Sequence, residues 1–161
     1  MEPPFSVALT GSPGTGKTTI AALAMEAGWR VTTVTALAEM YDMILEQDED
    51  GVHPIDINGL ASSVEFNDPV LIDGHLSHLL PVEASAIIRC DPSILSDRLQ
   101  NRDYPIWKIE SNVEWEMVGG PWGDRPNGRV AEFDSTNVSP PTLWMNIEKW
   151  LSSGAPDCHP H

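Results

Sequence analysis

Residues 11–18 read Gly-Ser-Pro-Gly-Thr-Gly-Lys-Thr and match the pattern G-x-x-x-x-G-K-[ST] at every specified position. Glycines let the backbone curl so that successive N–H groups point inward and make a nest for phosphate oxygens. The apolar run Ser6–Thr10 predicts a buried strand before the motif, and Thr18–Ala27 predicts a helix after it. A strand, a glycine loop and a helix in this order favour a phosphate-binding loop, because the helix aims its positive end at the same point.

In such a loop the lysine reaches the β and γ phosphates of a nucleoside triphosphate, and the hydroxyl that follows it ligates Mg²⁺. We therefore expect ATP and Mg²⁺ to bind here, with Lys17 on the phosphates and Thr18 on the metal. The residues expected to contact the nucleotide are Gly14, Thr15, Gly16, Lys17, Thr18 and Thr19.

A second apolar strand, Val70–Ile72, ends in Asp73, and His75 follows two residues later. An acid after a buried strand holds Mg²⁺ in P-loop proteins, directly or through water, and beside a phosphate loop this role is favoured over turn capping. Imidazole can orient an attacking oxygen at neutral pH. On residue type alone, a hydrogen bond within its own loop explains His75 equally well.

Helical and strand patterns alternate along the rest of the chain. Strands are expected at Trp29–Thr35, Ser85–Cys90 and Arg129–Phe133, and helices at Ala36–Gln47, Ile57–Phe66, Pro92–Asn101, within Asp103–Gly120, and at Thr142–Leu151. This alternation predicts an α/β fold with a parallel sheet covered on both faces. Ligands in such folds bind beyond the carboxyl ends of the strands, where the glycine loop and Asp73 both fall.

The chain has 161 residues, which suits one domain with one core, expected over residues 1–153 with a flexible tail at 154–161. No apolar run approaches the roughly 20 residues of a membrane helix, and the acidic, proline-rich start is not a signal peptide. Cys90 and Cys158 are too few for a disulfide scaffold. We expect a reduced, cytoplasmic protein without membrane contact.

Acidic side chains dominate the charge: 24 Asp and Glu against 9 Lys and Arg give a net charge of −15. Such a surface repels phosphate backbones, so direct binding of bare nucleic acid is not expected. It favours a basic protein partner, while a proteome adapted to salt is an equally good explanation.

Arg98 and Arg102 lie four residues apart on the helix predicted after the fourth strand. A cation there could swing over the triphosphate and stabilise the charge that develops during transfer. A solvated helix face paired with nearby acids is the alternative, and the spacing alone does not decide between them.

Four blocks in order resemble the small archaeal and eukaryotic adenylate-kinase-like ATPase family, whose human member is the coilin-interacting nuclear ATPase protein. The phosphate loop resembles the family's G-[TS]-P-G-[TV]-G-K-T-T, and Val70–His75 resembles its strand ending in D-x-H. Residues 98–104 resemble R-L-x-x-R-x-Y, and residues 108–116 resemble K-[LI]-x-x-N-[IV]-x-x-E. The likeness runs from about Ser6 to Leu151.

The resemblance implies a three-layer P-loop NTPase fold of adenylate-kinase type, with a five-stranded parallel sheet. It implies a nucleoside-monophosphate-binding segment at residues 36–59 and a short lid at 102–112. It further implies transfer of the ATP γ-phosphate to AMP or a related monophosphate, and ATP hydrolysis. By this analogy Lys17, Asp73, His75 and Arg102 are catalytic, and Asn137 and Val138 lie near the adenine.

Members of the family also assist maturation of the small ribosomal subunit and its rRNA by binding ribosomal protein uS11, a basic partner. The resemblance therefore implies uS11 and the pre-small-subunit particle as partners. Two alternatives stay open: an ATPase assembly factor with little kinase activity, and a P-loop kinase for another small metabolite. One departure bears on the choice, because Glu39 stands near the place where the family carries a cation for the acceptor phosphate.

Overall fold

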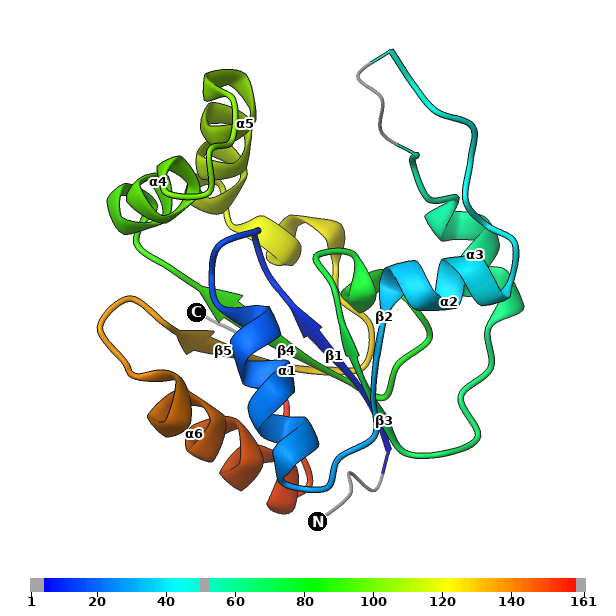
Figure 1. The fold of residues 1–161 in the computed structure, drawn as a ribbon. Helices are drawn as coiled ribbons and strands as arrows, with labels where there is room; N and C mark the ends of the chain where they lie inside the picture. Colours follow the sequence, from blue (N-terminus) through cyan, green and yellow to red (C-terminus); the bar gives the residue numbers. More distant parts are fainter. Residues whose placement is uncertain (1–4, 50–52, 159–161) are drawn as a thin grey trace.

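The computed structural model describes residues 5–49 and 53–158. Five strands form one sheet in the order β2-β3-β1-β4-β5, and all four neighbouring pairs are parallel. The strands are β1 Ser6–Thr10, β2 Val31–Thr33, β3 Val70–Asp73, β4 Ala84–Arg89 and β5 Arg129–Asp134. The predicted α/β P-loop fold with a five-stranded parallel sheet is confirmed (Figure 1).

Helices cover both faces of this sheet (Figure 1). They are α1 Lys17–Glu26, α2 Val34–Met40, α3 Ile57–Ser63, α4 Pro92–Gln100, α5 Ile106–Met117 and α6 Pro140–Ser152, with short 3₁₀ helices η1 Ser77–Leu79 and η2 Gly120–Asp124. Along β1, Val7 and Leu9 point into the core shared with α1 and α6, whereas Ala8 points into the core shared with α2 and α3. No helix in the described part of the chain is long and apolar enough to cross a bilayer.

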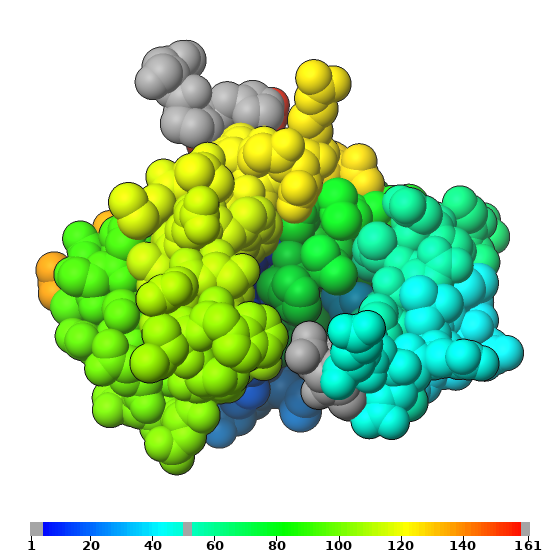
Figure 2. Space-filling model, turned by 90° about the horizontal axis from the view of Figure 1, so that it is seen from above, coloured from blue at the N-terminus to red at the C-terminus, as the bar shows by residue number. Residues whose placement is uncertain are grey.

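A third, smaller cluster holds α4 against α5, through Leu95, Leu99 and Ile109. These two helices rise on one side of the strand ends, and α2 with α3 rises on the other (Figure 1). Figure 2 looks down between them and shows a hollow flanked by the yellow-green α4–α5 unit and the cyan α2–α3 segment. The phosphate loop lies at the bottom of this hollow, so the fold presents its predicted site to an open cleft.

The second strand and the helix after it differ from the sequence-based expectation. β2 ends at Thr33 rather than Thr35, because the Thr33 hydroxyl accepts a hydrogen bond from the Ala36 amide at 3.0 Å and caps α2. The helix then ends at Met40 rather than Gln47. Asp42 adopts a left-handed φ of 57°, and Ile44 leaves to pair antiparallel with Ile55.

Residues 154–158 also depart from the flexible tail that we expected. Ala155 is fully buried, the Trp150 indole donates to the Pro156 carbonyl, and the Cys158 amide donates to the Val130 carbonyl at 2.7 Å. This stretch therefore lies against edge strand β5, whereas residues 159–161 fall outside the described part. On α5, the side chain of Trp107 is 59% exposed.

Candidate functional site

The phosphate loop connects β1 to α1 and has the backbone conformation that its glycines permit. Gly14 and Gly16 have φ of 88° and 106°, values that other residues rarely adopt. Gly11 is needed for space as well, because a Cβ there would lie 2.3 Å from the Ile88 carbonyl oxygen of neighbouring strand β4. The glycines thus bring the loop against the sheet and leave its amides to form the nest.

Lys17 is buried at the start of α1 and is folded back onto this loop. Its ammonium donates to the carbonyl of Gly11 at 2.7 Å and to the carbonyl of Ser12 at 2.9 Å. Burial lowers the pKa of Lys17 to about 8, while the Asp73 carboxylate acts in the opposite direction. A triphosphate in the nest would offer the ammonium anionic oxygens in place of these two carbonyls.

Asp73 ends β3, and its side chain faces the first turn of α1. The Thr18 hydroxyl lies 3.5 Å from Asp73 Oδ2, which leaves the pair only loosely joined. Burial raises the pKa of Asp73, and nearby Lys17 partly offsets this rise. Hydroxyl and carboxylate oxygens are the donors that Mg²⁺ prefers, and Mg²⁺ commonly takes only one or two of them from the protein, with phosphates and waters supplying the rest. The two side chains therefore fit the predicted metal role.

A cavity of about 370 Å³ extends from the phosphate loop toward α6. It is lined by the phosphate loop and the start of α1, by α4 and the turn after it, and by the segment from the end of β5 into α6: Gly14, Thr15, Gly16, Thr19, Ile20, Arg98, Asn101, Arg102, Ser135, Val138, Pro140 and Leu143. Val138, expected near the adenine, is among these lining residues. Asn137 does not line this cavity; it lines a different one, with Cys90 and Thr136.

A second cavity of about 440 Å³ lies on the other side of the loop, in the hollow of Figure 2. Its lining joins segments far apart in the sequence: Pro13, Gly14, Gly16, Lys17, Thr18, Thr33, Asp73, Gly74, His75, Arg102, Tyr104, Lys108 and Asn112. The four residues predicted to be catalytic, Lys17, Asp73, His75 and Arg102, therefore meet in one cavity. Arg102 lines both cavities, at the boundary between them.

His75 stands at the wall of this second cavity. Burial among the surrounding groups, together with the positive charge of Lys17, lowers the pKa of His75 to about 4. The residue is nonetheless exposed at the cleft, and its contact with water limits this lowering of the pKa. With its pKa lowered, the imidazole is mostly neutral at pH 7 and has a free nitrogen lone pair that can accept a proton.

Arg98, which the sequence left undecided, binds the phosphate loop from helix α4. Its guanidinium donates to the carbonyl of Gly14 at 3.2 Å and to the carbonyl of Ser135 at 3.2 Å. It is therefore not a solvated helix residue. Arg102 lies in the turn after α4, which ends at Gln100, so the two arginines do not share a helix face as the sequence predicted.

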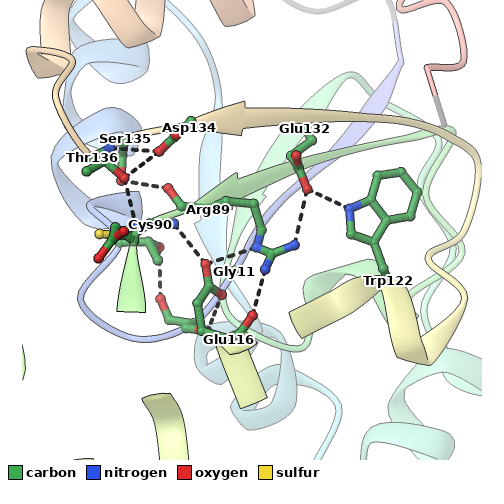
Figure 3. Close-up of polar contacts among 12 residues, drawn as sticks. Gly11, Arg89, Cys90, Glu116, Trp122, Glu132, Asp134, Ser135 and Thr136 are labelled. Carbon is green, nitrogen blue, oxygen red and sulfur yellow. Dashed lines mark hydrogen bonds and ion pairs between the residues drawn. The ribbon is translucent and has the colours of Figure 1, made fainter. Parts of the chain in front are cut away.

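Glu116 is the residue of the site that sequence reasoning passed over, and Figure 3 shows its contacts. Its carboxylate, on a residue only 1% exposed, accepts from the Ser12 hydroxyl at 2.8 Å, the Arg89 guanidinium at 2.9 Å and the Cys90 amide at 2.8 Å. The Arg89 guanidinium also forms an ion pair with the Glu132 carboxylate at 3.2 Å. The last acid of the K-I-x-x-N-V-x-x-E block thus joins helix α5 to the phosphate loop and to the end of β4.

Comparison with known proteins agrees with this fold and its phosphate loop. Residues 7–119 match a family described as "AAA domain". A protein of Pyrococcus abyssi named "Putative adenylate kinase" is 36% identical over 158 residues, which cover 92% of this chain and 84% of that protein. The chain belongs to the adenylate-kinase-like family of P-loop proteins.

A second member of this adenylate-kinase-like family, from Archaeoglobus fulgidus and of the same name, is 41% identical over 112 residues. The match covers 70% of this chain and 61% of that protein, less than two thirds of its length. Solved structures agree on the fold: a gluconokinase from Sinorhizobium meliloti has a TM-score of 0.64 at 17% identity, covering 96% of this chain and 95% of that one. At such identity the likeness concerns the fold alone.

Proposed function

We propose that the protein is a nucleoside-monophosphate kinase that transfers the γ-phosphate of ATP to AMP or a related monophosphate, and that also hydrolyses ATP. The observation that carries this proposal is the meeting of Lys17, His75 and Arg102 in one cavity beside the phosphate loop. Relatives named "Putative adenylate kinase" support the same reaction class. A cytoplasmic site of action remains part of the proposal.

In the proposed transfer, an oxygen of the acceptor phosphate attacks the γ-phosphorus of ATP and forms a new P–O bond. The bond from the γ-phosphorus to the β–γ bridging oxygen breaks, and its electron pair leaves with ADP. Lys17 turns from its loop carbonyls to the β and γ oxygens, and Arg102 faces the equatorial oxygens, where charge develops. The loop amides between Gly14 and Thr18 hold the phosphates in place.

Thr18 and Asp73 would hold Mg²⁺. When bound, this ion neutralises charge on the β and γ phosphate oxygens. Asp73 also lies close enough to Lys17 for each to shift the other's pKa, so the carboxylate helps to keep the ammonium charged.

Water replaces the monophosphate in the proposed hydrolysis. The neutral imidazole of His75 orients the water and takes its proton as the oxygen attacks the γ-phosphorus. The leaving group is again ADP.

The test is a coupled assay that measures ADP formation with AMP, with CMP, and with water alone. The proposal predicts faster ADP formation when a monophosphate is present, and loss of both reactions in Lys17→Ala. Equal rates with and without monophosphate would show an ATPase and contradict kinase activity.

A second candidate is an assembly role, in which ATP hydrolysis times release of ribosomal protein uS11 during small-subunit maturation. The net charge of −15 favours a basic partner of this kind. Co-purification of the protein with uS11 at moderate salt, with and without ATP, tests it. Absence of binding in both conditions would rule out this role.

A further inference from the structure

The basic side chains of the cleft come from only two places. All nine lysines and arginines of the chain fall within the described residues, and three of them line the 440 Å³ cavity: Lys17, Arg102 and Lys108. Lys17 belongs to the phosphate loop, and the other two belong to the lid. Arg89 and Arg98 are held by Glu116 and Gly14, away from this cavity.

The opposite wall of the cleft offers no cation. From residue 31 to residue 88 the sequence contains neither lysine nor arginine, and this stretch includes the α2–α3 segment expected to bind the acceptor. Glu39, on α2, is exposed but is not among the residues that line the cavity. An acceptor that carries a phosphate dianion would meet only negative or neutral groups on that side, so its charge has to be balanced from the lid.

Of the two lid cations, Lys108 lines only the 440 Å³ cavity, whereas Arg102 lines both cavities. Lys108 lies at the start of α5, and its Nζ stands 4.3 Å from the centre of the Tyr104 ring, which holds the long side chain against the lid. The side-chain amide of Asn112 donates a hydrogen bond to the backbone carbonyl of Lys108 at 2.9 Å, and both residues line the cavity. Its charge reaches His75 across the cleft, where it contributes to lowering the imidazole pKa.

Arg102 differs from Lys108, because it also lines the nucleotide cavity beyond the loop. It is therefore placed at the phosphoryl group in transit. Lys108 is left as the cation for a second, separate phosphate. In the described part of this cavity, no other basic side chain remains for that purpose.

We propose that Lys108 binds the phosphate of the acceptor nucleotide from the lid side, so that helix α5, rather than the α2–α3 segment, recognises the acceptor's charge. This inference rests on the proposed kinase function. The part of the acceptor that Lys108 recognises is the monophosphate dianion. Nucleosides without a phosphate gain nothing from this contact.

The experiment combines three variants with two ligands. Lys108→Met removes the charge and keeps the stem, Lys108→Arg restores a charge, and Lys149→Met removes an exposed charge on the distant helix α6 as a control. Binding of AMP and of adenosine is measured by calorimetry on protein saturated with a non-hydrolysable ATP analogue. The KM for AMP is measured in the coupled assay.

We expect Lys108→Met to weaken AMP binding and raise the KM for AMP by about 10- to 100-fold, the size typical of a hydrogen-bonded charge pair. Adenosine binding and the affinity for the ATP analogue should change by less than about twofold. Lys108→Arg should recover most of the AMP affinity, and Lys149→Met should match the wild type.

Equal AMP affinity in wild type and Lys108→Met would overturn the inference, whether or not the protein transfers phosphate. An equal loss of adenosine and AMP binding would also overturn it, because that pattern indicates a role in shaping the cleft. Wild-type protein that binds AMP without phosphorylating it would contradict the proposed function and leave the Lys108 comparison valid. Wild-type protein with no affinity for AMP would overturn both.

Discussion

Ser12 in the phosphate loop and Glu116 near the end of α5 lie 104 residues apart in the chain, and the Ser12 hydroxyl donates a 2.8 Å hydrogen bond to Oε1 of Glu116. The same carboxylate forms a 2.9 Å ion pair with Arg89 and accepts from the Cys90 amide. One buried acid therefore connects helix α5 to the phosphate loop and to the end of β4 in the central sheet.

Glu116→Ala should destabilise the protein by about 3 kcal/mol, because it leaves the Arg89 guanidinium and the Cys90 amide without their shared acceptor. Chemical denaturation measures the loss. Glu114→Ala, an exposed acid on the same helix, is the matched control and should shift stability by no more than about 0.5 kcal/mol. Similar losses in the two variants would mean that the buried network contributes nothing special.

ATP affinity should fall as the pH rises above about 8. Burial holds the pKa of free Lys17 near 8, below its ordinary 10.5, whereas the charge of a bound triphosphate raises this pKa. The free ammonium therefore loses its proton above pH 8 while the bound one keeps it, so binding takes up a proton in that range. Calorimetry at pH 8.5 in two buffers of different ionisation enthalpy measures this uptake. An affinity that stays constant up to pH 9.5 would contradict the assignment.

His75→Ala should slow ATP hydrolysis by about 100-fold while changing the Kd for ATP by less than about twofold, because the imidazole acts on the attacking water. His53→Ala removes an exposed histidine outside the cavity lining and should leave the rate unchanged. Because its environment lowers the pKa of His75, its imidazole resonances should stay in the neutral position between pH 7 and 8. Unchanged turnover in His75→Ala would remove this residue from the mechanism.

Gly11→Ala should cost the protein at least about 2 kcal/mol and most of its ATP affinity. The new methyl would meet the Ile88 carbonyl at 2.3 Å, and φ at this position is 144°. Gly123→Ala is the control, because a Cβ there has nothing within 4 Å and its φ is ordinary. Melting temperature and nucleotide binding, compared across the two variants, test the prediction; equal stability would show that the loop can move away from β4.

Much of the fold could be predicted because its signals are local. The run Ser6–Thr10 is apolar throughout, so β1 was placed correctly, and Asp91 followed by Pro92 marked the start of α4. The predicted end of β2 was wrong, because a threonine that caps a helix cannot be told from one in a β-branched strand by sequence alone. The structure shows that the Thr33 hydroxyl accepts a hydrogen bond from the Ala36 amide. The packing of residues 154–158 on β5 was missed because backbone hydrogen bonds to a distant strand leave no periodic pattern.

The sequence alone specified the phosphate loop, because this loop needs glycine at set positions and a lysine and a threonine directly after the last glycine. It also placed Asp73 and His75 at the end of a strand, where parallel sheets bind ligands. The packing of the folded chain was needed to show that Glu116 binds Ser12, that Asn137 does not line the cavity between the phosphate loop and α6, and that Lys108 and His75 line the same cavity. Such contacts depend on how separate helices pack over the sheet. Because hydrophobic packing is non-directional, the sequence carries no motif that predicts which distant side chains will be in contact.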